Sequence, residues 1–392
     1  MKRINVLDAL RGFALLGILL VNINFFNESL MTINYGGLPV EGWLNKTIDT
    51  LTVLFVNGKF MLLFAFLFGY GAVILYRNAE AAGKKFTWMF VKRMLALLLF
   101  GILHAVFLWY GDILSIYAIV GLIFLMFVKR RPKTLLTLSI VFSLLIPVIM
   151  SAAMLLGNQA GTEGMEDLYA IDPMELQLFQ QQDQQLYGAG TYMEMTMKRI
   201  VEYQSSFFNM VLFLPQILGT FLLGAYFGKR KLLEDIQSKK TFMVKLGWIG
   251  GIAGLALTVP RFFMDSSNSL LDIFSIFIGA PLLMLSYVAC FSLLYTRHPK
   301  WLHLFSYPGK MAFTMYILQS ILCGFIFYSY GLGLFGTMTL WQTMATAFLL
   351  FGLQIVISAI WLKRFRTGPL EYVWRVMYKG KNGARRSFQR EG

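Results

Sequence analysis

The sequence is poor in the residues that usually carry the chemistry of soluble enzymes. Its 392 residues include 2 cysteines and 3 histidines, and only 14% are charged. Cys290 and Cys323 lie inside apolar blocks, so the chain has no disulfide framework and no CxxC metal motif. His104, His298 and His303 lack zinc-site spacing, and no Gly-rich phosphate loop or serine-nucleophile motif is present. The sequence therefore predicts no bound metal.

Long apolar blocks make up most of the chain instead. Hydrophobic residues account for 57% of it, 36 residues are Phe, and the mean hydropathy is +0.62. A soluble domain of this length needs more polar surface. In lipid, backbone polar groups must pair internally, so the blocks are helices or barrel strands. Because stretches such as 14–21 and 95–103 are apolar on every face, whereas barrel strands alternate, we predict an all-α bundle.

About ten blocks are candidate transmembrane helices, since a span takes roughly 20 residues. They are 7–26, 51–75, 94–110, 113–128, 135–156, 207–227, 244–263, 270–295, 311–335 and 341–362. Little more than Gly111 and Asp112 separates the third block from the fourth, which predicts a tight helical hairpin. The sequence shows no clear inverted repeat and no pair of broken helices, two features of many secondary transporters.

Positive charge predicts how the bundle is oriented. Most of the 35 Lys and Arg residues fall in alternate connecting segments, counted from the N-terminus. The positive-inside rule assigns such segments to the cytoplasm. We therefore predict a multi-pass protein of the cell (plasma) membrane with a cytoplasmic N-terminus and C-terminus. Since the net charge of +15 has this topological role, the expected partner is the lipid bilayer and not nucleic acid, and a homo-oligomer stays open.

The chain is predicted to form a single transmembrane helical domain, residues 1–378, followed by a basic cytoplasmic tail, residues 379–392. The outer segment 157–206 is long and acidic, and it is either a solvated connector or contains a surface helix at 174–187. Residues 371–378 combine aromatic and basic side chains, which is typical of a short helix at the membrane interface.

Polar groups inside a bilayer are costly, so each one is a candidate functional residue. Asp8 and Arg11, at the inner end of the first block, are three residues apart and can pair on one helical face. Gly12 permits close approach of another helix. The pair is either a structural anchor for the helix or part of a cationic site for an anionic ligand from the cytoplasm.

A second group of polar residues is predicted near the outer face. Asn22, Lys59, His104 and Asp112 fall at similar depth if their blocks are regular helices. The structural alternatives are that Lys59 snorkels to the interface, Asp112 caps the following helix and His104 packs in the core. The functional alternative is one cavity open to the outer side. There the turn at Gly111 would bring the Asp112 carboxylate to the imidazole and make it a better general base.

Gln319 is a third candidate, with Tyr316 on the same block. It is predicted to lie near the membrane midplane, about 14 Å along the helix from Lys310. It either forms hydrogen bonds between helices or contacts a substrate.

Several motifs, in order along almost the whole chain, carry a family resemblance. They are LDALRG at 7–12, GKF at 58–60, LFG at 67–69, GILH at 101–104, WYGDIL at 109–114, YA at 117–118, GKMA at 309–312, YILQS at 316–320, YGLGLFG at 330–336 and GPLEYVWR at 368–375. Together they resemble the YeiB-like family of bacterial membrane proteins. That family is in turn remotely similar to transmembrane acyltransferases of the heparan-α-glucosaminide N-acetyltransferase group, mainly in the first helix.

The acyltransferase resemblance implies transfer of an acyl group from cytoplasmic acyl-CoA to an acceptor on the far side. That group uses an outer-side asparagine and histidine. Asn22 matches the asparagine, but no histidine follows it in the first outer loop, so His104 would take this role from another helix. Arg11 would lie on the path of the donor.

Three functions therefore remain open from the sequence. The first is a membrane acyltransferase with acyl-CoA as donor and a hydroxyl or amine acceptor, such as an envelope glycan or a small molecule. Its catalytic residues would be His104, Asp112 and Asn22, and Lys59, Arg11, Asp8 and Gln319 would bind substrate. The second is a transporter or exporter of a small solute, and the third is a non-catalytic partner protein.

Overall fold

The computed structural model describes residues 4–35, 37, 39–159, 172–263, 269–385 and 388, and its regular structure in these residues is helical. The longer helices are α1 (Asn5–Asn27), α3 (Trp43–Phe55), α4 (Lys59–Ala81), α5 (Phe86–Phe107), α6 (Leu114–Phe124), α7 (Pro132–Gln159), α9 (Pro173–Ala189), α10 (Tyr192–Leu212), α11 (Leu214–Lys229), α12 (Lys240–Thr258), α14 (Ala280–Arg297), α17 (Ala312–Phe327), α18 (Leu340–Arg364) and α19 (Pro369–Arg385). The short ones are α2 (Leu30–Asn34), η1 (Val259–Phe262), α13 (Ser269–Phe274), η2 (Ser275–Gly279), α15 (Pro299–Leu302), η3 (His303–Phe305) and α16 (Ser306–Lys310).

Within the described residues, seven helices are long and apolar enough to cross a membrane. The number is nine if each of two bent pairs forms one span: α10 with α11, bent by 61°, and 299–310 with α17, bent by 79°. The all-α polytopic bundle predicted from the sequence is thus confirmed. The fourth predicted block is shorter than expected, because the helical part of 113–128 is the 11-residue α6. Each bent pair is either a broken span or a re-entrant loop, and the sequence did not reveal these bends.

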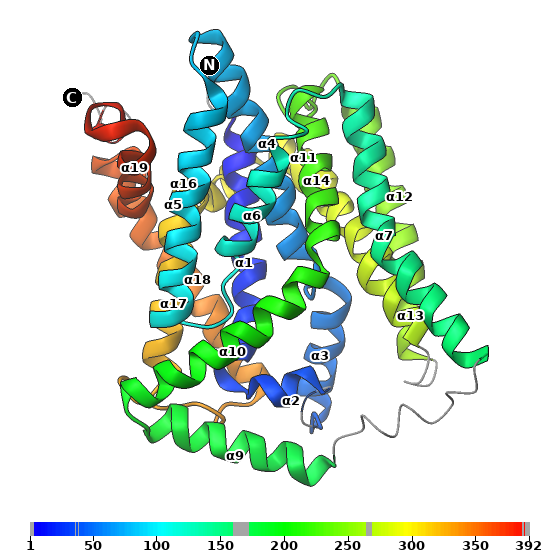
Figure 1. The fold of residues 1–392 in the computed structure, drawn as a ribbon, viewed down its shortest axis with the longest axis vertical. Helices are drawn as coiled ribbons and strands as arrows, with labels where there is room; N and C mark the ends of the chain where they lie inside the picture. The colour runs from blue at the N-terminus through cyan, green and yellow to red at the C-terminus, as the bar shows by residue number, and fades with distance from the viewer. Residues whose placement is uncertain are drawn as a thin grey trace.

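The two ends of the bundle differ (Figure 1). Both chain termini lie at one end, which also carries the cationic segments 82–85 and 230–239, and we call it the basic end. Helix α9 lies across the opposite end, which we call the α9 end. The surface helix predicted at 174–187 is confirmed by α9, whose Asp172 side chain accepts a hydrogen bond from Met174 N–H at 2.8 Å. Glu163, Glu166 and Asp167 of the acidic segment lie outside the described residues.

Helix α1 is the most buried of the long apolar helices and runs through the middle of the bundle (Figure 1). It packs against α4, α16, α17 and α18. Gly12 and Gly309 allow α1 to touch η3 and α16 backbone to backbone. A Cβ at Gly12 would lie 1.9 Å from the Phe305 carbonyl oxygen, and one at Gly309 would lie 1.7 Å from that of Asp8. The close helix approach predicted at Gly12 is therefore present.

The outer helices expose apolar side chains of the kind that lipid covers. Ile140 and Val148 of α7, Ile252 of α12, and Leu349 and Val356 of α18 are all exposed large hydrophobic residues. Exposed apolar surface of this extent is rare on soluble monomers, and it matches helices that face hydrocarbon.

Candidate functional site

A cavity of about 1150 Å³ opens at the basic end, between α1, α4, α5, α6, α17 and α19. Along α1 it extends from Ile4 to Ile18, which is ~21 Å of helix axis. Its lining changes with depth. Arg77, Glu234 and Arg375 line the part near the basic surface, and the deeper part is largely apolar. The cavity therefore suits an elongated ligand with a polar, anionic head and a less polar chain.

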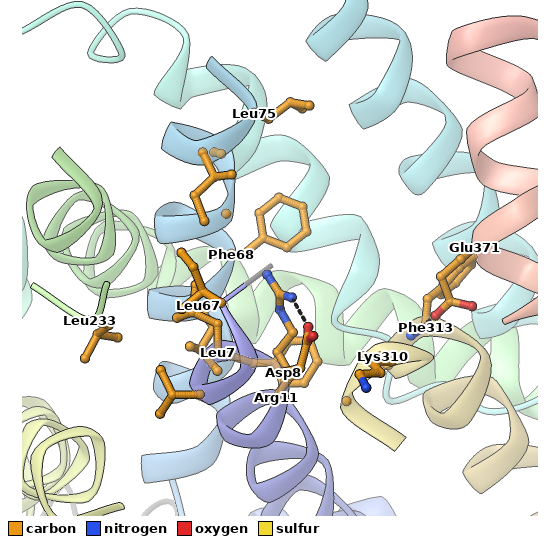
Figure 2. Close-up of a pocket in the computed structure, with 18 of the residues that line it drawn as sticks. Leu7, Asp8, Arg11, Leu67, Phe68, Leu75, Leu233, Lys310, Phe313 and Glu371 are labelled. Carbon is orange, nitrogen blue, oxygen red and sulfur yellow. Dashed lines mark hydrogen bonds and ion pairs between the residues drawn. The ribbon is translucent and has the colours of Figure 1, made fainter. Parts of the chain in front are cut away.

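Charged side chains of both signs line this cavity. Its six cations are Arg11, Arg77, Arg93, Lys231, Lys310 and Arg375, and its four carboxylates are Asp8, Glu234, Asp235 and Glu371. Figure 2 shows Arg11 paired with Asp8 on α1, and Lys310 and Glu371 on other elements around the same space. The distance from Arg11 Nη1 to Asp8 Oδ1 is 3.0 Å. The predicted Asp8–Arg11 pair is therefore formed, and it lines the cavity.

Arg93 of α5 is held in place by aromatic rings of α19. Its guanidinium lies 4.1 Å from the Trp374 ring centroid, and Trp374 Nε1 donates to the Arg93 carbonyl at 3.0 Å. The Arg93 Nη1 donates to the Tyr378 hydroxyl at 3.4 Å, whereas its Nε has no hydrogen-bond partner. Among the described residues Arg93 pairs with no carboxylate. A half-buried guanidinium with spare donors is a favourable anion-binding group.

Glu371 does not add free negative charge to the cavity, because it caps α17. Its Oε1 accepts from the Phe313 and Thr314 N–H groups at 2.8 and 3.2 Å, and its Oε2 accepts from Thr314 Oγ1 at 2.5 Å. These are the unpaired N–H groups expected at the start of a helix. Helix α17 begins after the sharp bend at Met311, so the cap comes from α19 and not from the preceding residues.

The deep part of the cavity ends beside a polar cluster in the bundle core. His104 Nδ1 lies 3.1 Å from Asp112 Oδ1, and His104 Nε2 lies 2.8 Å from Ser320 Oγ. Asp112 also accepts from the Ser115 N–H and hydroxyl, at 2.8 and 2.7 Å. Tyr316, which lines the cavity, has its ring 5.1 Å from the His104 ring. A single layer of side chains thus separates the cavity from the cluster.

The hydrogen bonds fix the tautomer of His104. Asp112 accepts four hydrogen bonds, which suits an ionised carboxylate, so its contact with Nδ1 requires the proton on Nδ1. Nε2 of the neutral ring is then an acceptor, and the Ser320 hydroxyl donates to it. Asp112 both caps α6 and binds His104, so its two predicted roles coexist.

The structure does not place all four predicted outer residues in one open cavity. The side chains of His104 and Asp112 are completely covered. Lys59 donates to the Val53 carbonyl at 2.6 Å, at the junction of α3 and α4. Asn22 is half-buried on α1, and no hydrogen bond in the described part of the chain joins it to His104. The reason is that Lys59 forms a hydrogen bond with a backbone carbonyl at the break between α3 and α4. The sequence predicts only that Lys59 lies at the same depth as the other three residues, and it does not reveal this break.

Gln319 ties three helices together. Its Nε2 donates to the Leu15 carbonyl of α1 at 3.2 Å and to Gln354 Oε1 of α18 at 3.0 Å. It is buried, and it does not line the cavity at the basic end. Of the two roles predicted for Gln319, the structure therefore supports hydrogen bonding between helices.

Sequence reasoning missed Ser320 and Arg93. Ser320 follows Gln319 in the YILQS motif, but a lone serine in an apolar block carries no signal of its own. Arg93 was counted only as a loop charge, although the repeated pattern of aromatic residues at 374 and 378 could have indicated a partner for it.

The fold and the site define a class of protein: a multi-pass α-helical membrane protein with a deep cavity at its basic end. Residues 227–381 match the family described as "Protein of unknown function (DUF418)". The chain is 35% identical over 392 residues to the protein "Uncharacterized protein YxaH" of Bacillus subtilis (strain 168), covering 95% of this chain and 94% of YxaH. It is 27% identical to "Uncharacterized protein YeiB" of Escherichia coli (strain K12), covering 96% of each. The chain therefore belongs to the YeiB-like family.

Proposed function

We propose that this protein is an acyltransferase of the cell membrane. It takes an acyl group from cytoplasmic acyl-CoA, bound in the cavity at the basic end, and passes it to a hydroxyl or amine acceptor on the other side. The observation that carries the proposal is the position of the cavity, which begins among cations and ends beside the His104 cluster.

The chemistry of acyl-CoA fits the change in lining along the cavity. Its phosphates are anionic and suit Arg11, Arg93 and Lys310, whereas its pantetheine chain and acyl group suit the apolar inner part. The thioester would then lie near Tyr316, at the inner end. His104 acts there as the general base that takes the proton of the attacking group, a role that a histidine held by a carboxylate performs well.

The test is binding of acetyl-CoA and of a longer acyl-CoA to the purified full-length protein. Arg11→Gln is expected to weaken binding by ~10-fold or more, the effect of losing one charge-assisted contact. Lys84→Gln is the matched control, because Lys84 is an exposed cation at the same end but outside the cavity. A protein that neither binds nor hydrolyses any acyl-CoA would show the proposal to be wrong.

Transport of a small anionic solute is the second candidate, and the two bent helix pairs favour it. The break between α16 and α17 lies at the cavity, since Lys310 and Ala312 both line it. Broken helices beside a binding site are typical of secondary transporters. Flux of a small anionic solute into proteoliposomes without any acyl donor, lost in Arg11→Gln but kept in Lys84→Gln, would support transport over acyl transfer.

A further inference from the structure

We propose that Ser320 is a catalytic nucleophile that receives the acyl group as a serine ester, with His104 as its base and Asp112 as the residue that orients the base. This inference deepens the proposed acyl transfer and rests on it. A covalent intermediate would let the acyl group cross from the cavity to the α9 end without donor and acceptor being bound together.

The three side chains have the geometry of a Ser–His–Asp triad. Ser320 on α17, His104 on α5 and Asp112 before α6 are joined by two hydrogen bonds, of 2.8 and 3.1 Å. The hydroxyl donates to Nε2, while Nδ1–H donates to the carboxylate, which is the direction that nucleophilic catalysis requires. A serine inside a helix can bond to the carbonyl one turn before it, whereas the described hydrogen bond of Ser320 goes to the imidazole.

The triad lies between the cavity and the surface of α10. On the cavity side, Tyr316 is one turn before Ser320 on α17, ~6 Å along the axis, and it lines the inner end. On the other side, the hydroxyl of Tyr203, a half-buried residue of α10, lies 3.1 Å from Ser115 Oγ, which in turn donates to Asp112. The cluster is thus one residue away from the cavity and two residues away from a partly exposed face of α10.

The reaction balances with the groups present and the two substrates. When the Tyr316 ring moves aside and admits the thioester to the cluster, the Ser320 hydroxyl oxygen attacks the thioester carbonyl carbon, and its proton goes to His104 Nε2. The carbon–sulfur bond breaks, and the leaving thiolate takes that proton to become free CoA thiol. An acceptor hydroxyl or amine then attacks the serine ester and gives its proton to His104, which returns it to Ser320 as the ester carbon–oxygen bond breaks. Asp112 stays ionised and stabilises the imidazolium.

The experiment uses a fluorophosphonate probe, which reacts with activated serines and needs no acyl donor. In the detergent-purified full chain, wild type is expected to be labelled at Ser320, as located by peptide mass spectrometry. Labelling is expected to be lost in Ser320→Ala and Ser320→Cys and slowed ~100-fold or more in His104→Gln and Asp112→Asn. A hydrogen bond with a purely structural role would not make Ser320 react with the probe.

Ser292→Ala is the matched control, because Ser292 is an equally buried helix serine on α14 with no hydrogen-bond partner in the described structure. It is expected to be labelled like wild type. Absence of label on wild type, or label that persists in Ser320→Cys, would overturn the inference. Its failure is distinguishable from failure of the proposed function. Acyl-CoA binding without serine labelling would refute the Ser320 nucleophile and still agree with direct acyl transfer from donor to acceptor. Serine labelling without acyl-CoA binding would support the nucleophile and refute acyl-CoA as the donor.

Discussion

At the residue scale, the contact between His104 and Asp112 depends on a glycine. Gly101 lies one turn before His104 on α5 and faces the turn that carries Asp112. A Cβ there would lie 2.6 Å from Asp112 Oδ2 and 2.4 Å from Ser115 Oγ. Both atoms belong to buried side chains that share hydrogen bonds, so neither can move without breaking one.

We therefore expect Gly101→Ala to lower the free energy of unfolding by about 1–3 kcal/mol, the usual cost of overpacking. It should also reduce acyl transfer, because the carboxylate no longer orients the imidazole. Thermal unfolding in detergent measures the first effect. Gly352→Ala is the control, since nothing lies within 4 Å of a Cβ at this exposed position of α18. It should be neutral or stabilising by up to about 1 kcal/mol. Equal effects of the two substitutions would contradict this account.

Whether a contact in the site could be predicted depended mainly on how many residues separate its two partners along the chain. The His104–Asp112 contact was predicted because eight residues and one turn connect the two. Ser320 was not, because 216 residues separate it from His104 and only the contact of α17 with α5 brings them together. The role of Lys59 was missed for a different reason, since its partner, the Val53 carbonyl, is close in the sequence but lies at a break between α3 and α4 that the sequence does not reveal.

At the element scale, α19 is more than a helix on the membrane surface. It supplies the Glu371 cap of α17 and the rings that hold Arg93, so it closes one side of the cavity. Burial raises the pKa of the Glu371 carboxyl above its ordinary value of 4.5, and the hydrogen bonds from Thr314 and Phe313 oppose that rise. The folded state therefore holds the Glu371 proton more tightly than the unfolded state does.

The sign of the pH dependence follows from this. A group that binds its proton more tightly when folded makes the free energy of unfolding fall as pH rises from 4.5 through the folded pKa. We expect Glu371→Gln, which keeps an acceptor for Phe313 N–H, to flatten this slope and to stay folded. Glu371→Ala should lower the thermal midpoint throughout, because it leaves N–H groups of α17 uncapped. Thermal midpoints of the wild type and both variants, measured from below pH 4.5 to neutrality, test these expectations. An unchanged slope in Glu371→Gln would show that another group titrates.

The membrane-spanning helices themselves were predictable, because ten long apolar blocks follow one another along the chain. The two bends were not. Pro215 follows directly on the break between α10 and α11, but prolines also occur inside unbroken spans, as Pro147 does in α7. The start of α10 at Tyr192 was missed because its first three turns carry four charged residues and match a surface segment as well as a membrane helix.

At the scale of the whole molecule, the distribution of charge predicts which end faces the cytoplasm. In a chain with Cys290 and Cys323 replaced by Ser, cysteines are introduced at Asp172 and Lys239, both exposed and at opposite ends. An impermeant maleimide is expected to label position 172 in intact cells, and position 239 only after permeabilisation. Labelling of 239 but not of 172 in intact cells would invert the topology and place the cavity outside.

The cavity could not be predicted from the sequence, although many of its residues were quoted in motifs. Its walls come from both halves of the chain, from Ile4 to Tyr378, and depend on how α1, α5 and α19 lean on one another. The central claim is that this cavity holds an acyl-CoA donor. The most direct measurement is an experimental structure of the full chain with saturating acyl-CoA. The account predicts ligand density among Arg11, Arg93 and Lys310, with the thioester end toward Tyr316. An empty cavity, or ligand density at the α9 end instead, would contradict it.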